Sequence, residues 1–178
     1  MALIDLKTNL AQKVSPQDII HFNGKRVSKF PRPRMWIYHK PVGELCSNFD
    51  PSGKRTVFES FPALGKISLI GRLDFNSEGL LLLTNKGYLK RYMELPKNKI
   101  NRTYLVKTWG KELTSENLNE IRQGIKILKF QYANIGINWV SKNKNYNWYK
   151  IKLYEGKNRE IRKILRYFGL EVKKLIRT

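Results

Sequence analysis

Asp74 is the first candidate for chemistry, because it is an acid at the centre of a polar loop in a very basic chain. The apolar run Ile67–Ile70 leads into this loop and Leu80–Leu83 follows it, which predicts a strand, an exposed loop and a buried strand. Near Arg72, the carboxylate could act as a nucleophile or a base. A turn or capping role is the alternative, since many aspartates in such loops bind backbone amides.

Tyr104 and Arg102 form a second candidate pair, within the alternating segment Asn101–Trp109 that predicts a strand. An aromatic ring beside a cation is the combination that single-stranded nucleic-acid sites use to stack a base. The alternative for Tyr104 is a half-buried strand aromatic. The residue types alone favour that alternative.

A C-terminal helix carries the third group of candidates. Apolar residues recur at helical spacing at Ile161, Ile164, Leu165 and Phe168. We expect this helix to begin near Asn158 and to end at Gly169. The cations around its N-terminus are Lys157, Arg159 and Arg162. The helix dipole disfavours cations there by a few tenths of a kcal/mol each, so we expect a compensating anion, either a phosphate or Asp74. A plain amphipathic helix is the alternative.

Charge limits the class of partner. The chain has 35 Lys and Arg against 14 Asp and Glu, a formal net charge of +21. Phosphate backbones are therefore the natural partner. An anionic membrane is disfavoured because the longest apolar run, Leu80–Leu83, is far below the roughly 20 residues that span a bilayer.

Cysteine and histidine content limits cofactors and compartment. Cys46 alone cannot form an intramolecular disulfide, and only His21 and His39 accompany it, so we expect no Cys/His metal site. The N-terminus lacks the charged and apolar regions of a signal peptide. These features predict a cytoplasmic protein without a metal.

The chain divides into three predicted parts. Residues 1–28 contain a hairpin around an Asn-Gly step, a piece too small to be stable alone. Residues 29–34 are a basic linker with two prolines. Residues 35–178 form the main domain, with short helices at Tyr88–Leu95 and from Thr114 to Gly124. Its remaining predicted strands lie at 35–40, 125–132, 134–140 and 146–154. We expect an α+β fold with a mostly antiparallel central sheet flanked by helices.

The segment Gly71–Asn85 resembles the signature of the rRNA pseudouridine synthases of the RsuA/RluB group. Further segments that follow the order of that family are Tyr38–Gly43, Asp50–Pro51 with Thr56–Phe58, Arg102–Val106 and Glu155–Lys163. Gly43–Ser47 and Asn158–Glu160 are most similar to the members that act on large-subunit rRNA. The resemblance runs from about Val14 to the end of the chain.

The resemblance implies a pseudouridine synthase-like fold that isomerises one uridine in rRNA, with neither metal nor cofactor. It implies that Asp74 is the catalytic aspartate, that Tyr104 stacks on the base and transfers a proton, and that Arg162 pairs with Asp74. The remaining implied substrate-binding residues are Arg72, Ile161, Lys40, Arg102, Lys157 and Arg159. Among these, Ile161 closes the pocket, Arg72 helps to hold the target nucleotide flipped out, and Lys40, Lys157 and Arg159 contact phosphates. Large-subunit rRNA is the expected partner of a monomer.

Both ends differ from the family pattern. Residues 1–28 match only the closing hairpin of a small RNA-binding module, and Val172–Thr178 resembles the start of the family's last strand. We therefore expect a remnant of that module at the N-terminus and a C-terminally truncated catalytic domain. A truncated or inactive relative that only binds RNA is the main alternative. A third alternative, a basic ribosome-associated structural protein, explains the charge but not the ordered motifs.

Overall fold

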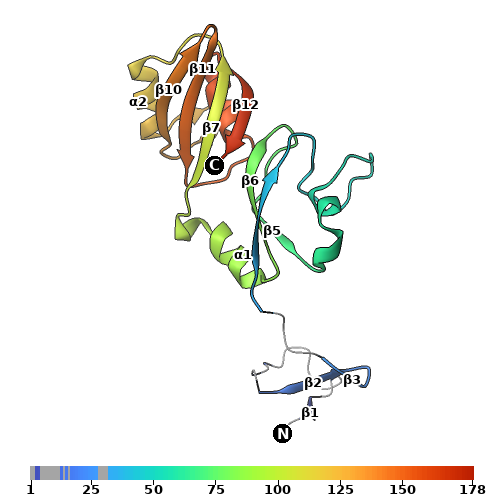
Figure 1. Ribbon diagram of the computed structural model, residues 1–178. Coiled ribbons are helices and arrows are strands. Elements are labelled where there is room, and N and C mark those ends of the chain that lie inside the picture. Colours follow the sequence, from blue (N-terminus) through green and yellow to red (C-terminus); the bar gives the residue numbers. More distant parts are fainter. Residues whose placement is uncertain (1–2, 5–12, 14, 16, 28–31) are drawn as a thin grey trace. The chain divides into compact units, whose positions relative to one another are not determined.

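A computed structural model describes residues 3–4, 13, 15, 17–27 and 32–178 (Figure 1). The chain divides into two compact units, Met1–Arg32 and Pro33–Thr178. Residues 29–31 of the predicted linker, 29–34, lie outside the described residues.

The first unit contains a small sheet in the order β1-β2-β3. Strand β2 (Ile19–Phe22) pairs antiparallel with β3 (Lys25–Arg26), and parallel with β1 (Leu3–Ile4), which the sequence did not predict. The hairpin turn has positive φ angles at Asn23 and Gly24, 49° and 71°, as a type I′ turn requires. The predicted hairpin is confirmed.

The second unit is built on a seven-stranded sheet in the order β10-β11-β7-β12-β6-β4, with β5 also paired to β6. Its strands are β4 (Met35–Lys40), β5 (Ser68–Ile70), β6 (Glu78–Thr84), β7 (Arg102–Trp109), β10 (Gly136–Asn143), β11 (Tyr146–Leu153) and β12 (Glu171–Arg177). Strand β12 runs parallel to β6, and the other described pairs in this sheet are antiparallel. The predicted α+β fold with a mostly antiparallel sheet is confirmed.

The helices follow the predicted pattern. They are α1 (Gly87–Glu94), α2 (Ser115–Gln123) and α3 (Glu160–Tyr167), with short 3-10 turns at Val57–Ser60, Pro62–Leu64 and Pro96–Asn98. Helix α2 begins as expected, because the hydroxyl of Thr114 accepts a hydrogen bond from the Asn117 N–H at 3.3 Å.

One predicted strand is wrong. Residues 125–132 form two short strands, β8 (Lys126–Ile127) and β9 (Phe130–Gln131), which pair with each other. The chain reverses at Leu128, whose φ is 54°. Tyr132 N–H then bonds the carbonyl of Ile125 at 2.9 Å, and the side chains of both residues are buried in the larger hydrophobic cluster.

Two hydrophobic clusters lie beside the loop that carries Asp74. The larger joins the inward faces of β7 and β11 to α3 and contains Tyr104, Ile161 and Leu73. The smaller joins β5 and β6 to the 3-10 turn at Val57 and contains Leu69. The Asp74 loop therefore leaves one cluster at the end of β5 and reaches the other at Leu73.

Gly79 permits the contact between the two halves of the sheet. Strand β12 pairs with β6 at Ile176–Glu78 and Arg177–Gly79. The φ of Gly79 is 105°, and a Cβ there would lie 2.2 Å from the carbonyl oxygen of Arg177. A side chain at this position is therefore incompatible with the observed sheet.

Candidate active site

The Asp74 loop, Gly71–Ser77, joins β5 to β6 and is held along its backbone. Leu73 N–H bonds Cys46 Sγ at 3.3 Å, Gly43 N–H bonds the carbonyl of Phe75 at 2.9 Å, and Ser77 N–H bonds the carbonyl of Asp74 at 3.0 Å. At the start of the loop, Gly71 N–H bonds Glu94 Oε1 of α1 at 2.7 Å. Because its backbone is bonded at successive residues, the loop presents the Asp74 side chain in one direction.

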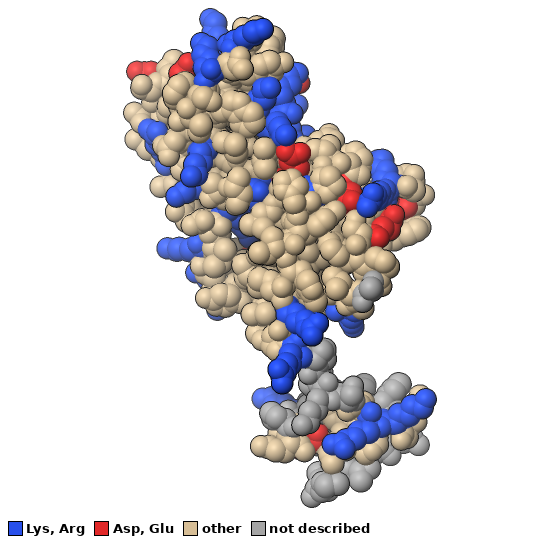
Figure 2. All heavy atoms as spheres, in the orientation of Figure 1, with Lys and Arg blue, Asp and Glu red and all other residues tan. Residues whose placement is uncertain are grey.

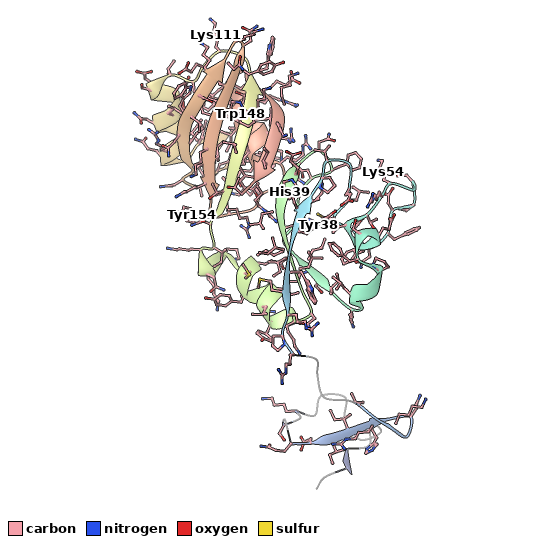
Figure 3. The ribbon with its side chains drawn as sticks, in the orientation of Figure 1. Tyr38, His39, Lys54, Lys111, Trp148 and Tyr154 are labelled. Carbon is pink, nitrogen blue, oxygen red and sulfur yellow. The ribbon has the colours of Figure 1, made fainter. Side chains whose placement is uncertain are left out.

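Hydrogen bonds and an ion pair also fix the segment that contains Gly43 and Cys46, the two residues that bond the loop. Cys46 and Gly43 follow β4, whose Tyr38 and His39 are labelled in Figure 3. The Tyr38 hydroxyl donates to Glu44 Oε2 at 2.7 Å, and burial raises the pKa of Tyr38. Glu44 also pairs with Arg55 at 3.1 Å. These contacts fix the segment that in turn fixes the Asp74 loop.

The carboxylate of Asp74 faces two guanidinium groups. Its Oδ2 lies 3.6 Å from Arg159 Nη1 and 3.9 Å from Arg162 Nε, and the side chain is 32% exposed. No described residue donates a hydrogen bond to the carboxylate. The hydrogen bond of the local turn uses the Asp74 backbone carbonyl. The expected alternative of a capping aspartate is therefore not supported, and the carboxylate is available to a substrate.

Arg162 connects α3 and β12 to the Asp74 loop. Nη1 donates to the carbonyl of Val172 at 3.2 Å, and Nη2 donates to the carbonyl of Asn76 at 2.8 Å and to Ser77 Oγ at 3.4 Å. Its Nε is buried without a hydrogen bond among the described residues. Burial and Arg159 lower the pKa of Arg162, while Asp74 raises it. The predicted pairing of Arg162 with Asp74 is present as an ion pair.

Helix α3 begins one residue later than expected. Its N-cap is Arg159 rather than Asn158, because the chain turns into the left-handed region at Arg159, where φ is 51°. This turn directs the exposed Arg159 side chain to Asp74, which supplies the anion that the sequence predicted. At the other end, Gly169 has a φ of 74° and its N–H bonds the carbonyl of Arg166, so the predicted end is confirmed.

Tyr104 lies on the helix-covered face of β7. Its side chain is 8% exposed and belongs to the hydrophobic cluster that contains Ile161 and Leu73, the residue before Asp74. Its hydroxyl makes no hydrogen bond with a described residue. The structure thus brings Tyr104 and Ile161 to the cluster that borders the Asp74 loop, and the Tyr104 phenol has no partner in the described part of the chain.

Lys40 does not occupy the position expected of a phosphate contact. It is 0% exposed, and its Nζ donates to the carbonyls of Pro41 at 2.7 Å and Ser77 at 2.8 Å. Burial lowers the pKa of Lys40, against the opposite effect of nearby groups that include Glu44 and Asp74. The phosphate role is wrong for this conformation, because the ammonium group is enclosed and anchors the end of the Asp74 loop.

Three other cations that were expected to bind RNA differ in whether their side chains are already bonded within the protein. Lys157 Nζ bonds Glu155 Oε2 at 2.6 Å and the carbonyl of Gln131 at 2.7 Å. Arg102 Nη1 lies 3.4 Å from the carbonyl of Glu155. Arg72 is exposed, and no described residue forms a hydrogen bond or ion pair with its side chain. Of these three cations, Arg72 is therefore the freest to contact RNA.

Sequence reasoning missed Cys46 and Ser77. Cys46 Sγ accepts the Leu73 N–H, and Ser77, which is almost fully buried, contacts Arg162 through Oγ and Lys40 through its carbonyl. Ser77 lies three residues after Asp74 in the same loop, which was a usable signal. The contact of Cys46 with Leu73 spans 27 residues, so nothing local indicated it.

Positive charge extends well beyond this site. Figure 2 shows Lys and Arg side chains spread over the visible face, with Asp and Glu confined to small patches. The described residues contain no group of three or more His, Cys, Asp or Glu that could hold a metal ion. No helix in the described part of the chain is long and apolar enough to cross a membrane.

Comparison with known proteins gives a consistent result. The model of the RNA pseudouridylate synthase family matches residues 34–167. An uncharacterized RNA pseudouridine synthase of Rickettsia typhi is 43% identical over 94% of this chain and 68% of that protein. Ribosomal large subunit pseudouridine synthase B of Buchnera aphidicola is 35% identical over 93% of this chain and 66% of that protein.

Solved structures agree on the fold. A crystal structure of a pseudouridylate synthase superposes with a TM-score of 0.73 at 25% identity, over 93% of this chain and 70% of that one. Human RNA pseudouridylate synthase domain containing 4 shares the fold at 12% identity, with a TM-score of 0.56. The chain therefore belongs to the RNA pseudouridine synthases, isomerases of the RsuA/RluB type.

Proposed function

We propose that this protein converts one uridine of ribosomal RNA to pseudouridine and that Asp74 is its catalytic carboxylate. The main support for this proposal is that the backbone of the Asp74 loop is fixed while its carboxylate is left available. The backbone of Gly71–Ser77 is bonded at successive residues, whereas the Asp74 carboxylate is partly exposed and accepts no hydrogen bond from a described residue. Such preorganisation positions a reactive group at little cost during the reaction.

The reaction moves atoms within one nucleotide. The bond between C1′ and N1 breaks, the base turns, and a bond forms between C1′ and C5, while C5 loses its proton and N1 gains one. Asp74 can take part by attacking the sugar, by attacking the base or by helping to form a glycal, and all three routes stay open. The reaction is redox-neutral, so the chemistry needs only nucleophilic and proton-transfer groups.

Tyr104 and Arg162 complete the proposed catalytic set. The phenol of Tyr104 would stack on the target base and transfer a proton, because its ring borders the Asp74 loop and its hydroxyl has no described partner. Arg162 would keep the carboxylate aligned through the ion pair at 3.9 Å. Ile161, buried in the same cluster as Tyr104, would close the apolar side of the pocket.

The target nucleotide must leave its stack to reach Asp74, a step that costs a few kcal/mol and is easiest in loops and bulges. Arg72, exposed two residues before Asp74, is suited to hold the flipped nucleotide. Arg159, Lys157 and Arg102 would contact the flanking phosphates. We propose Lys40 as the anchor of the loop instead.

Large-subunit rRNA is the proposed substrate, because several relatives carry the name ribosomal large subunit pseudouridine synthase B. A monomer in the cytoplasm stays a prediction from the sequence. So does the assignment of residues 1–28, 29–34 and 35–178 to an N-terminal RNA-binding part, a linker and a catalytic domain.

RNA binding without catalysis is the second candidate, favoured by the net charge of +21. The Asp74 loop argues against it. A protein selected only to hold phosphates gains nothing from an immobilised, partly exposed carboxylate among its cations, since that carboxylate repels phosphate.

The test is direct. Unmodified transcripts of large-subunit and small-subunit rRNA are incubated with the protein, and pseudouridine is mapped by chemical modification and primer extension. We expect one modified uridine in the large-subunit transcript. RNA binding without product in either transcript, or in ribosomal particles, would establish the binding-only alternative.

A further inference from the structure

Glu160, the first residue of α3, is a buried acid that the proposed reaction does not use. Its side chain is 2% exposed. Its Oε2 accepts a hydrogen bond from the Lys157 N–H at 3.3 Å, while Oε1 is buried without a donor among the described residues. A buried carboxylate oxygen without a hydrogen-bond donor costs free energy, so burial favours the protonated form of Glu160.

The carboxyl groups of Glu155 and Glu160 act on each other, and Glu155 already has donors of its own. Glu155 Oε1 accepts from the Ala133 N–H at 2.9 Å and Oε2 accepts from Lys157 Nζ at 2.6 Å. Because both oxygens of Glu155 are supplied with donors, Glu155 is the member of the pair suited to remain ionised. A proton on Glu160 would then supply the hydrogen bond that joins the two carboxyl groups.

Electrostatics support this division of roles. Burial and Glu155 raise the pKa of Glu160 to about 8. Burial alone would raise the pKa of Glu155 as well, but hydrogen bonds from Ala133, Lys157 and Glu160 lower it. Lys157 is the cation whose ammonium group contacts Glu155, whereas Arg102 of β7 lies at the Glu155 backbone carbonyl and Arg159 at the N-cap of α3 pairs with Asp74. Despite these cations, burial dominates at Glu160.

We propose that Glu160 is a positioning residue that acts as a neutral carboxylic acid, donating a hydrogen bond to Glu155 and so holding the turn Glu155–Arg159 in place. This inference rests on the proposed function of Asp74. The turn ends in the left-handed Arg159, a conformation that needs support. The support comes from the Lys157 N–H bond to Glu160 and from the Glu160 N–H bond to the Lys157 carbonyl at 3.3 Å.

Loss of the Glu160 proton would affect the Asp74 carboxylate by displacing Arg159. Two adjacent carboxylates repel each other, and the charge on Glu160 would be buried. The turn would open, and Arg159, 3.6 Å from Asp74, would lose its position. The helix dipole favours an anion at this end of α3, but this effect is small compared with the cost of a buried charge.

Three variants test the inference through the pH dependence of kcat/KM for pseudouridine formation. In wild type, kcat/KM should fall as the pH rises through about 8. The amide of Glu160→Gln has nearly the shape of a neutral carboxyl group and keeps one donor and one acceptor, but it cannot ionise. We therefore expect activity within about threefold of wild type at pH 7, and no further loss at pH 9 from ionisation at this position. Glu160→Ala should lose at least tenfold at pH 7. Glu120→Gln, an exposed change on α2, should match wild type throughout.

A second readout does not depend on activity. The pKa of the Glu160 carboxyl is about 4.5 in the unfolded chain and about 8 in the folded protein. Between pH 4.5 and pH 8, Glu160 therefore binds a proton in the folded state but not in the unfolded state. The folded state therefore binds more protons in this window, and stability should fall as the pH rises through it. The melting temperature of wild type relative to Glu160→Gln should decline from pH 5 to pH 8.

The outcomes separate the two proposals. A carboxyl titration of Glu160 below pH 6 by ¹³C NMR, or a Glu160→Gln enzyme as impaired as Glu160→Ala, would overturn the positioning role. Wild type without activity at any pH would remove the proposed function and, with it, the catalytic part of this role. In that case the melting curves and the NMR titration would still decide whether Glu160 carries the proton.

Discussion

Replacing Arg162 by alanine should disable the site by releasing the Asp74 loop. Arg162 is 14% exposed and donates to the carbonyls of Asn76 and Val172 as well as to Ser77. Hydrogen bonds to a charged group contribute about 1.5–3 kcal/mol each. Some of this is regained from water in the vacated space, so we expect a net loss of about 3 kcal/mol in the free energy of unfolding. A domain of this size should then melt about 6–12 °C lower.

The catalytic effect of this substitution should exceed its effect on stability. Arg162 bonds the carbonyl of Asn76, two residues after Asp74 in the same loop, and a displacement of about 1 Å at a reacting group can cost about 100-fold in rate. We therefore expect kcat for pseudouridine formation to fall at least about 100-fold at a temperature where the variant is folded.

Arg166→Ala is the matched control for this prediction. Arg166 is an exposed cation one turn further along α3, so its loss removes the same charge without touching the loop. We expect its melting temperature and kcat to stay near those of wild type. More than half of the wild-type kcat in Arg162→Ala, or an equal loss of kcat in Arg166→Ala, would show that Arg162 does not hold the Asp74 loop.

Three further predictions follow from single contacts. Tyr104→Phe should keep the packing and stacking of the ring but lower kcat about 10- to 100-fold through loss of the hydroxyl; full activity in a single-turnover assay would exclude its proton-transfer role. Gly79→Ala should reduce soluble folded protein strongly, because the added Cβ would meet the Arg177 carbonyl at 2.2 Å; a wild-type melting curve would show that the sheet tolerates it. Lys40→Met should lower kcat at least about tenfold by freeing the Ser77 carbonyl, with little change in the salt dependence of RNA binding; a shallower salt slope measured by filter binding would restore its phosphate role.

Local patterns in the sequence were sufficient to predict the strands around Asp74 and helix α3. The apolar runs that flank Asp74 form β5 and β6, because a buried strand needs only its own residues to be apolar. The spacing of Ile161, Ile164 and Leu165 placed their common face in the core. The cations near the N-terminus of α3, where the helix dipole disfavours positive charge, also predicted an anion close to this helix.

Features that depend on distant residues, or on an uncommon backbone conformation, were not predictable in this way. The burial of Lys40 results from a bond to Ser77, 37 residues later, whereas a lysine in a basic chain is normally exposed. The left-handed turn at Arg159 moved the start of α3, and its backbone conformation is uncommon for arginine. Strand β12 lies between β7 and β6 in the centre of the sheet, a position that only pairing with both neighbours defines.

The central claim is that Asp74 performs the chemistry rather than shaping its loop. Asp74→Asn keeps the size of the side chain and leaves the backbone bonds of Gly71–Ser77 unaltered. The decisive measurement is pseudouridine formed in large-subunit rRNA by this variant, with RNA affinity determined in parallel over a range of salt concentrations. We expect a loss of at least about 1,000-fold in product formation, with RNA affinity and salt dependence nearly unchanged. Product at the wild-type rate would contradict the claim.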